Sequence, residues 1–202
     1  MSPKVSEAHV KSRKRDILDA AAVCFARAGL HGATMDGICT QAGLSKGAVY
    51  GYFKSKDALI SALKVESVQR DAAIIRSTTQ SGDPEEAFSA MFAAVLDTVG
   101  SGPGGVKWKT DVLTWAESLL SQRLLDSQVI ETQLWADALE ILAEEAQRRG
   151  RISANVDARA MGWTLTSVIY GAVAVRSWDD NFDPSQVVAV VSDILSGRSF
   201  NG

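Results

Sequence analysis

The chain has 202 residues, of which 46% are apolar, so it can bury the core of one large domain or of a small and a medium one, and this composition argues against a disordered protein. No run of about eighteen or more apolar residues occurs and the chain starts with polar residues, which excludes a membrane-spanning helix and a signal peptide and leads us to expect a cytoplasmic protein. The net charge of −3 is unevenly distributed along the chain: residues 1–64 (the head) carry +5 and residues 65–202 (the body) carry −8. This asymmetry indicates that only the head binds a polyanion, and DNA is the first candidate.

Apolar residues recur at three- and four-residue spacing along the chain, without the alternation typical of strands, so we expect an all-α fold. The first predicted helix begins near Lys11 and ends at Gly29, which can close it in a left-handed cap. Its apolar face consists of Ile17, Leu18, Ala21, Phe25 and Ala28. The helix starts with four basic residues, Lys11, Arg13, Lys14 and Arg15. They form either a solvated helix end or an arm that contacts DNA.

Residues 34–53 have the pattern of a helix-turn-helix. Thr34 is a suitable N-cap for a second helix, Gly43 ends that helix, and Ser45 caps a short third helix. The outward positions of the third helix hold small residues, namely Gly47, Ala48 and Gly51. Small residues allow a helix to lie close to base edges in a major groove, so the pattern predicts a DNA-reading segment.

A fourth predicted helix runs from Lys56 to Thr78 and connects the head to the body. Glycine and proline clusters then separate further predicted helices at about 84–99, 107–124, 127–149, 157–179 and 184–197. The glycine-rich stretch 100–105 follows no strand and lacks the lysine of a phosphate-binding loop, so we expect a flexible helix-helix connection there.

Cysteine and histidine are too few and too widely spaced for a disulfide scaffold or a zinc site, so we expect no metal and no cofactor. The two histidines are His9 and His31. The two cysteines, Cys24 and Cys39, are expected to be small core residues, with a redox-sensing pair as the alternative.

One pattern of residues covers roughly the first third of the chain in a fixed order. It consists of Ile17-Leu18-Asp19-Ala20-Ala21, Phe25, Gly29, Thr34, Ile38, Ala42-Gly43-Leu44-Ser45-Lys46-Gly47 and Tyr50-Gly51-Tyr52-Phe53-Lys54-Ser55-Lys56-Asp57-Ala58-Leu59. This pattern closely resembles the TetR (tetracycline repressor) family of transcriptional regulators. The resemblance implies a flexible N-terminal arm (1–10), a helix-turn-helix DNA-binding domain (11–71), and a C-terminal ligand-binding and dimerisation domain (72–202). Two residues depart from the family pattern, Gly37 where an acidic residue is common and Tyr52 where a histidine is common.

The resemblance also assigns the DNA contacts. Thr34 and Tyr50 would donate hydrogen bonds to phosphates, and Lys46 and Lys56 would approach phosphates as positioning charges. The bases would be read by the exposed edge of the third helix, which holds Ser45, Gly47, Ala48, Gly51 and Tyr52. Without this context, Tyr50 and Tyr52 would be interpreted as ordinary surface aromatics.

The body is rich in aromatic residues, and the resemblance implies an apolar ligand pocket among its helices. The residues that we expect to line this pocket are Phe88, Phe92, Trp108, Trp115, Leu119, Trp135 and Leu139. Asp111 and Glu117 are candidate polar partners for a cationic or hydroxylated ligand. For each of these side chains, plain packing in the core is the alternative.

The last two predicted helices are apolar over more than one stripe, so they have two surfaces to bury. One surface would cover the core and the other a second copy of the chain, through Trp163, Val168, Val173, Val187, Val191 and Ile194. A dimer presents two recognition helices to successive major grooves about 34 Å apart, which predicts a palindromic operator. We therefore expect a homodimeric repressor that a small apolar or amphipathic effector releases from DNA.

Two other classes of function remain as alternatives. An enzyme is disfavoured, because no histidine lies beyond position 31 and both cysteines lie in the head. A sequence-nonspecific architectural DNA binder is disfavoured because such proteins are generally basic overall, whereas this body is acidic.

Overall fold

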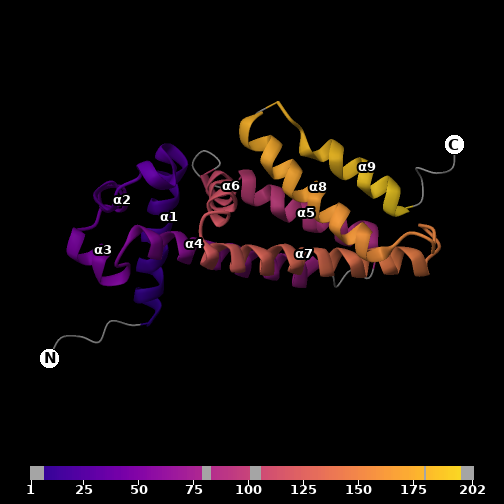
Figure 1. The fold of residues 1–202 in the computed structure, drawn as a ribbon, viewed down its shortest axis with the longest axis horizontal. Coiled ribbons are helices and arrows are strands. Elements are labelled where there is room, and N and C mark those ends of the chain that lie inside the picture. Colours follow the sequence, from indigo (N-terminus) through magenta and orange to yellow (C-terminus); the bar gives the residue numbers. More distant parts are fainter. Residues whose placement is uncertain (1–6, 79–82, 101–105, 180, 197–202) are drawn as a thin grey trace.

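A computed structural model describes residues 7–78, 83–100, 106–179 and 181–196, and every regular element in these ranges is a helix, which confirms the predicted all-α fold. The helices are α1 (Glu7–Gly32), α2 (Met35–Ala42), α3 (Lys46–Tyr52), α4 (Lys56–Thr78), α5 (Pro84–Gly100), α6 (Val106–Ser118), α7 (Gln122–Arg148), α8 (Ala158–Trp178) and α9 (Pro184–Ser196). Figure 1 shows α1, α2 and α3 at one end of an elongated molecule and α5, α7, α8 and α9 at the other. Within the described ranges, no helix is long and apolar enough to cross a membrane.

The start of the chain is more helical than we predicted. Residues 7–10, which we assigned to the flexible arm, belong to α1, while residues 1–6 lie outside the described part of the chain. Arg13 and Arg15 therefore stand on the helix, where they form exposed ion pairs with Asp16 (3.5 Å) and Asp19 (3.6 Å). Most of the predicted connection 100–105 also lies outside the described residues.

The helix ends of the head follow local signals. The Gly37 N–H donates to Thr34 Oγ1 at 3.1 Å and the Ala48 N–H donates to Ser45 Oγ at 3.2 Å, so both predicted N-caps are confirmed. Gly43 ends α2 in the left-handed region at φ 64°. Gly29 also has a positive φ (73°), but it kinks α1 instead of ending it, because the Ala33 N–H still donates to the Gly29 carbonyl and one further turn forms.

A first apolar cluster holds α1, α2, α3 and the start of α4 together. Its fully buried members include Ile17, Phe25, Ile38, Val49 and Leu59. Both cysteines are free thiols that pack in this cluster, and burial raises the pKa of Cys24. Burying these side chains is the main contribution to the stability of the helix-turn-helix, since α2 and α3 are too short to be stable alone.

The fourth helix matches its predicted span from Lys56 to Thr78 and leads from the head into the body (Figure 1). Leu59 at its start packs in the first cluster, and Ile75 near its end packs in a second cluster with α5, α7, α8 and α9. Between these two points the buried face of α4 is polar and holds Lys64, Ser67 and Asp71. This helix is therefore the mechanical connection between the two clusters.

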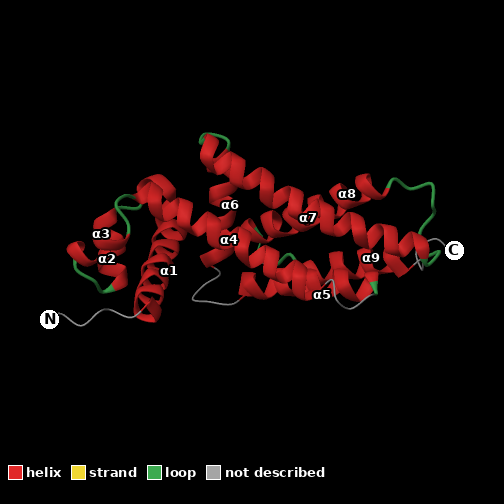
Figure 2. Ribbon diagram, turned by 90° about the horizontal axis from the view of Figure 1, so that it is seen from below, coloured by secondary structure: helices red, strands yellow, loops and turns green. Residues whose placement is uncertain are grey.

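The boundary between α6 and α7 differs from our prediction of helices at 107–124 and 127–149. The Leu119 and Leu120 N–H groups donate to Ala116 and Glu117 carbonyls, three residues back, and close α6 in a tighter turn. Ser121 then takes an extended conformation ahead of α7. The resulting corner projects from the molecule in Figure 2 and leaves Leu119 and Leu120 about four-fifths exposed.

The second cluster fills the body, and its centre includes Phe88, Met91, Trp135, Leu139 and Leu165. The helices α7 and α8 pack closely at Gly162. A Cβ added there would lie only 2.6 Å from the Ala136 carbonyl oxygen. The absence of a side chain at this position therefore sets the distance between the two helices.

Candidate nucleic-acid interface and buried cavity

The outer face of α3 is open. Lys46, Gly47, Tyr50 and Gly51 are exposed, and Ala48 is half-buried. A Cβ added at Gly47 or Gly51 would meet no neighbouring atom within 4 Å, so no described residue covers the helix at these two positions. Val49 on the opposite side is fully buried and holds the helix against the first cluster. A partner can thus approach the backbone of α3 closely.

An exposed ion pair lies beside this face. Lys46 Nζ donates to Asp36 Oδ2 at 2.6 Å, and the two side chains are 66% and 63% exposed. The hydrogen bond to Asp36 raises the pKa of Lys46, with the carboxylate charge adding to it. Because the pair is in water, phosphate can compete with Asp36 for the ammonium at little cost.

Two of the residues that we predicted to contact DNA hold the head together instead. Lys56 Nζ donates to the His31 carbonyl at 2.9 Å and to the Ala33 carbonyl at 3.2 Å, so its ammonium holds the start of α4 to the end of α1. Tyr52 is half-buried and packs against the first cluster. Among the other residues predicted to contact DNA, Ala48 is half-buried. The rest are exposed, namely Thr34, Ser45, Lys46, Gly47, Tyr50 and Gly51.

The body contains a small cavity of about 30 Å³ bounded by α4, α5, α6, α7 and α8. Its aromatic wall consists of Trp108, Trp115, Trp135 and Tyr170. The rings of Trp115 and Tyr170 are stacked with centroids 4.7 Å apart. Such a volume holds only one or two water molecules, so a larger ligand must displace the walls.

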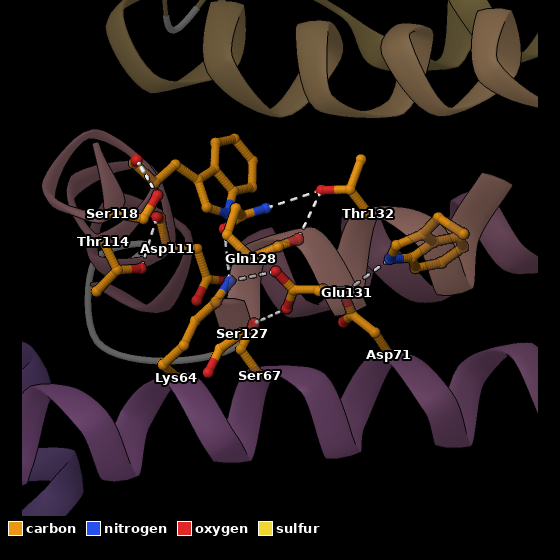
Figure 3. Close-up of polar contacts among 12 residues, drawn as sticks. Lys64, Ser67, Asp71, Asp111, Thr114, Ser118, Ser127, Gln128, Glu131 and Thr132 are labelled. Carbon is orange, nitrogen blue, oxygen red and sulfur yellow. Dashed lines mark hydrogen bonds and ion pairs between the residues drawn. The ribbon is translucent and has the colours of Figure 1, made fainter. Parts of the chain in front are cut away.

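The polar wall of the cavity consists of Ser67, Arg70, Asp71, Asp111 and Glu131. Figure 3 shows Ser67 and Glu131 in a hydrogen-bonded network with Lys64, which does not itself line the cavity. Lys64 on α4 forms an ion pair with Glu131 on α7, and both side chains are 1% exposed. Lys64 Nζ also donates to Gln128 Oε1 at 2.6 Å, and Ser67 Oγ donates to Glu131 Oε1 at 2.8 Å. These bonds tie α4 to α7 through groups that water does not reach.

A second set of contacts in this wall involves Arg70 and Asp71 on α4. Arg70 Nη2 donates to Asp111 Oδ2 on α6 at 3.0 Å and to Ser67 Oγ at 2.9 Å, and Arg70 Nε donates to Asp71 Oδ1 at 3.3 Å. The indole N–H of Trp135 donates to Asp71 Oδ2 at 2.8 Å. Burial raises the pKa of Asp71 to about 6, with the charge of Glu131 adding to the shift and Arg70 opposing it.

An open groove of about 380 Å³ lies outside the cavity between α1, α4 and α6. It shares Ser67, Arg70 and Asp111 with the cavity wall. The groove also exposes Lys11 and Arg15 of α1. Arg70 therefore stands between the cavity and the outer groove.

The predicted ligand-binding residues fall into three groups. Trp108, Trp115, Trp135 and Asp111 line the cavity. Phe88, Phe92 and Leu139 are buried in the second cluster and do not line it, which agrees with the packing alternative. The structure places the other two outside: Leu119 is 79% exposed at the α6–α7 corner, and Glu117 pairs with His31 Nε2 at 3.0 Å.

Sequence reasoning missed Tyr170 of the aromatic wall and most of the polar wall, namely Ser67, Arg70, Asp71 and Glu131. It also missed Lys64, the buried partner of Glu131. A signal was present in α4, where buried positions recur at three- and four-residue spacing and include polar residues between Ile60 and Ile75. A polar residue on an otherwise apolar helix face indicates a buried partner on another helix.

The predicted dimer residues also divide. Trp163 is 39% exposed, and Val168, Val187 and Ile194 are half-buried. Val173 and Val191 point into the same chain, since Val173 lines the cavity and Val191 belongs to the second cluster, so neither is available to a partner. Two large apolar side chains that we did not predict are also exposed on α8 and α9, Trp178 (70%) and Val190 (60%).

Comparison with known proteins gives two family matches. The model of bacterial regulatory proteins, tetR family, matches residues 17–63, and that of the C-terminal part of BetI-type transcriptional repressors matches residues 84–198. The chain is 30% identical over 145 residues to the transcriptional regulator BetI of Paraburkholderia phytofirmans, covering 68% of this chain and 73% of that protein. It is 46% identical over 72 residues to the repressor Rv1474c of Mycobacterium tuberculosis, a match covering 36% of this chain and 38% of that relative.

Solved structures share the fold. A putative transcriptional regulator from Pseudomonas aeruginosa aligns with a TM-score of 0.77 at 20% identity, covering 96% of this chain and 94% of that one. AibR in complex with isovaleryl coenzyme A and operator DNA aligns with a TM-score of 0.70 at 18% identity, covering 92% of this chain and 98% of that one. The families and relatives named here are transcriptional regulators and not enzymes.

Proposed function

Since this chain belongs to the tetR family of bacterial regulatory proteins and is a transcriptional regulator, we propose that it is a repressor that binds a palindromic operator as a homodimer and leaves it when a small molecule occupies the body. The observation that carries this proposal is the open outer face of α3, where two glycines leave the backbone uncovered. Close approach of a helix to base edges needs such a face.

The DNA contacts divide into base readers and phosphate contacts. Ser45, Gly47, Ala48 and Gly51 lie on or next to the exposed edge of α3 and are proposed to face the bases. Thr34, Lys46 and Tyr50 are proposed to bind phosphates, with Lys46 exchanging Asp36 for DNA. Tyr52 and Lys56 contribute from within, by holding α3 and the start of α4 in place. The DNA-binding domain would comprise residues 11–71, with the body of 72–202 behind it.

The dimer is proposed to form through α8 and α9. Trp163, Trp178 and Val190 present exposed apolar surface on these two helices, and such surface in a soluble chain is stabilised by a partner. A two-fold axis through this surface would give two copies of α3 at opposite ends of one interface. The spacing of the two half-sites would then report the geometry of the dimer.

The effector is proposed to enter the cavity beside α4. The cavity volume of about 30 Å³ is too small for a drug-sized molecule, so occupancy must move at least one of the surrounding helices. Because α4 continues into the first cluster, its displacement changes the position of α3. A ligand that prefers the expanded cavity thereby disfavours the DNA-bound state. AibR, which shares the fold, has been solved with both a coenzyme A thioester and operator DNA.

The test is selection of bound sequences from a random pool of double-stranded DNA at physiological salt. We expect a palindrome bound about 10³-fold or more above bulk DNA, as for specific regulators. Gly47→Ala is tested in the same selection as the wild type. Its added Cβ meets no atom of the described residues within 4 Å, so a loss of enrichment reports a contact with DNA. Enrichment of no sequence, or of a non-repeated one, would contradict the proposal.

A further inference from the structure

We infer that the outer groove between α1, α4 and α6 is the route by which a small molecule reaches the cavity, and that the Arg70 side chain is the gate that closes this route. The inference rests on the proposed function, because it says where the effector enters. Three features of the molecule carry it: the residues that the groove and the cavity share, the way other sides of the cavity are closed, and the bonds that hold Arg70 across the opening.

The groove and the cavity meet at three residues. Ser67, Arg70 and Asp111 line both spaces, of which the groove measures about 380 Å³ and the cavity about 30 Å³. Deep in the cavity, Glu131 and Trp135 are each 1% exposed, whereas the side chains of Asp111 and Arg70 are 18% and 27% exposed. Exposure therefore increases from the cavity towards the groove, and the shared residues form the boundary between buried space and solvent.

Two other sides of the cavity are closed by contacts that are costly to break. Between α4 and α7, Lys64 and Glu131 form an ion pair in which each side chain is 1% exposed (Figure 3). Between α6 and α8, the rings of Trp115 and Tyr170 are stacked with centroids 4.7 Å apart. Breaking the ion pair would leave a buried charge, and separating the rings would expose aromatic surface to water. Compared with these two sides, the boundary between α4 and α6 costs less to open.

Arg70 spans this boundary with a side chain that can move. Its Nη2 donates to Asp111 Oδ2 on α6 at 3.0 Å and to Ser67 Oγ on α4 at 2.9 Å, and its Nε donates to Asp71 Oδ1 at 3.3 Å. Glu66 also lines the groove, one helical turn before Arg70, where a carboxylate and a guanidinium can pair on the helix surface. Rotation of Arg70 towards Glu66 would keep the guanidinium paired in water and leave the boundary between groove and cavity open.

The opening lies at the junction of the head and the body. The Arg70–Asp111 bond joins α4 to α6, and the neighbouring Thr110 Oγ1 donates to the Ala22 carbonyl of α1 at 3.3 Å. The helix α1 forms the other wall of the groove. A molecule that passes Arg70 therefore acts at the contacts that set how the head sits on the body.

The test measures access to the cavity without an effector, by hydrogen–deuterium exchange in the full chain followed by heteronuclear NMR. The indole N–H of Trp135 donates to Asp71 Oδ2 at 2.8 Å in the cavity wall, so it exchanges when water reaches the cavity. The backbone N–H groups of Phe88 and Leu139 are the references, because both residues are fully buried in the second cluster and do not line the cavity. We expect slow exchange at all three sites in the wild type.

Two variants open the gate from opposite sides. Arg70→Ala removes the gate, and Asp111→Asn weakens its attachment to α6. Each should accelerate exchange of the Trp135 indole about tenfold or more relative to the backbone references, because water no longer waits for a local opening. Gln69→Ala is the matched control, since Gln69 lines the groove but not the cavity, and its exchange should equal that of the wild type. If Arg70→Ala does not fold, Asp111→Asn alone still decides.

Unchanged exchange of the Trp135 indole in the folded variants would overturn the inference, since the groove would then not lead to the cavity. Equal acceleration of the indole and the backbone references would also overturn it, because the body as a whole would have loosened. The experiment contains no DNA, so it separates this inference from the proposed function. If the gate opens as expected and no operator is selected, the access route stands and the repressor proposal fails; if a palindrome is selected and both variants exchange like the wild type, the reverse is true.

Discussion

Two lysine–carboxylate pairs, one at the surface of the head and one between α4 and α7, show how burial changes the role of an ion pair. Lys46 and Asp36 are both more than 60% exposed, so their bond can be exchanged for another at little cost. Lys64 and Glu131 are each 1% exposed, and neither can lose its partner without leaving a charge away from water. The first pair is suited to binding, and the second fixes the position of α4.

The largest expected effect is on the buried pair. Lys64→Met should lower the free energy of unfolding by about 3–5 kcal/mol, because Glu131 is left as an uncompensated buried carboxylate. The double variant Lys64→Met/Glu131→Leu should recover most of this loss, since no charge remains. Chemical denaturation measures both. If the single and the double variant unfold alike, the comparison between the two pairs fails.

The next effect separates a buried glycine from an exposed one. Gly162→Ala should lower the free energy of unfolding by about 1–3 kcal/mol, because the new Cβ would lie 2.6 Å from the Ala136 carbonyl oxygen and force α7 and α8 apart. Gly51→Ala in α3 is the control, since its Cβ meets nothing, and alanine should stabilise the helix by up to about 1 kcal/mol. Equal effects in thermal unfolding would contradict the packing described for Gly162.

The helix caps of the head and the buried pair between α4 and α7 differ in how far the sequence could predict them. The caps Thr34, Ser45 and Gly43 were predictable because each acts on a helix end within a few residues. The interior was not predictable, because Lys64 and Glu131 are 67 residues apart and only the packing of α4 on α7 joins them. The end of α6 was missed for another reason: Leu119 and Leu120 continue an apolar pattern, although both are exposed at the corner.

A pH effect of intermediate size should come from Asp71. Burial raises its pKa to about 6 in the folded chain, so the native state binds a proton more tightly than the unfolded state does. The stability that this proton contributes is present below the unfolded pKa of about 4 and is lost as the pH rises through about 6. Relative to Asp71→Asn, the wild type should therefore lose about 1–2 kcal/mol of unfolding free energy between pH 4 and pH 7. Parallel pH profiles of the two proteins would contradict the buried position of this carboxylate.

A smaller effect should appear at the open face of α3, where only binding changes. Gly51→Ala should weaken binding to the selected operator by about tenfold, since a methyl group holds the helix away from the bases. Its unfolding midpoint should not fall, so the loss cannot come from misfolding. Fluorescence anisotropy with operator and with unrelated DNA measures the effect. A loss that is equal for both DNAs would assign Gly51 to the phosphates.

The smallest effect should come from the exposed pair, and its sign is what matters. Asp36→Asn frees Lys46 for phosphate and removes a negative charge beside the DNA, so affinity for every DNA sequence should rise by a few-fold, more at low salt than at high salt. The unfolding free energy should fall by no more than about 1 kcal/mol, from the lost ion pair and from the lost carboxylate in the first turn of α2. Asp126→Asn on α7 makes the same change in net charge in the body and should leave DNA affinity unchanged. If Asp36→Asn instead weakens binding, Asp36 holds Lys46 in its binding position, and the exposed pair acts as a positioning contact in the same way as the buried one.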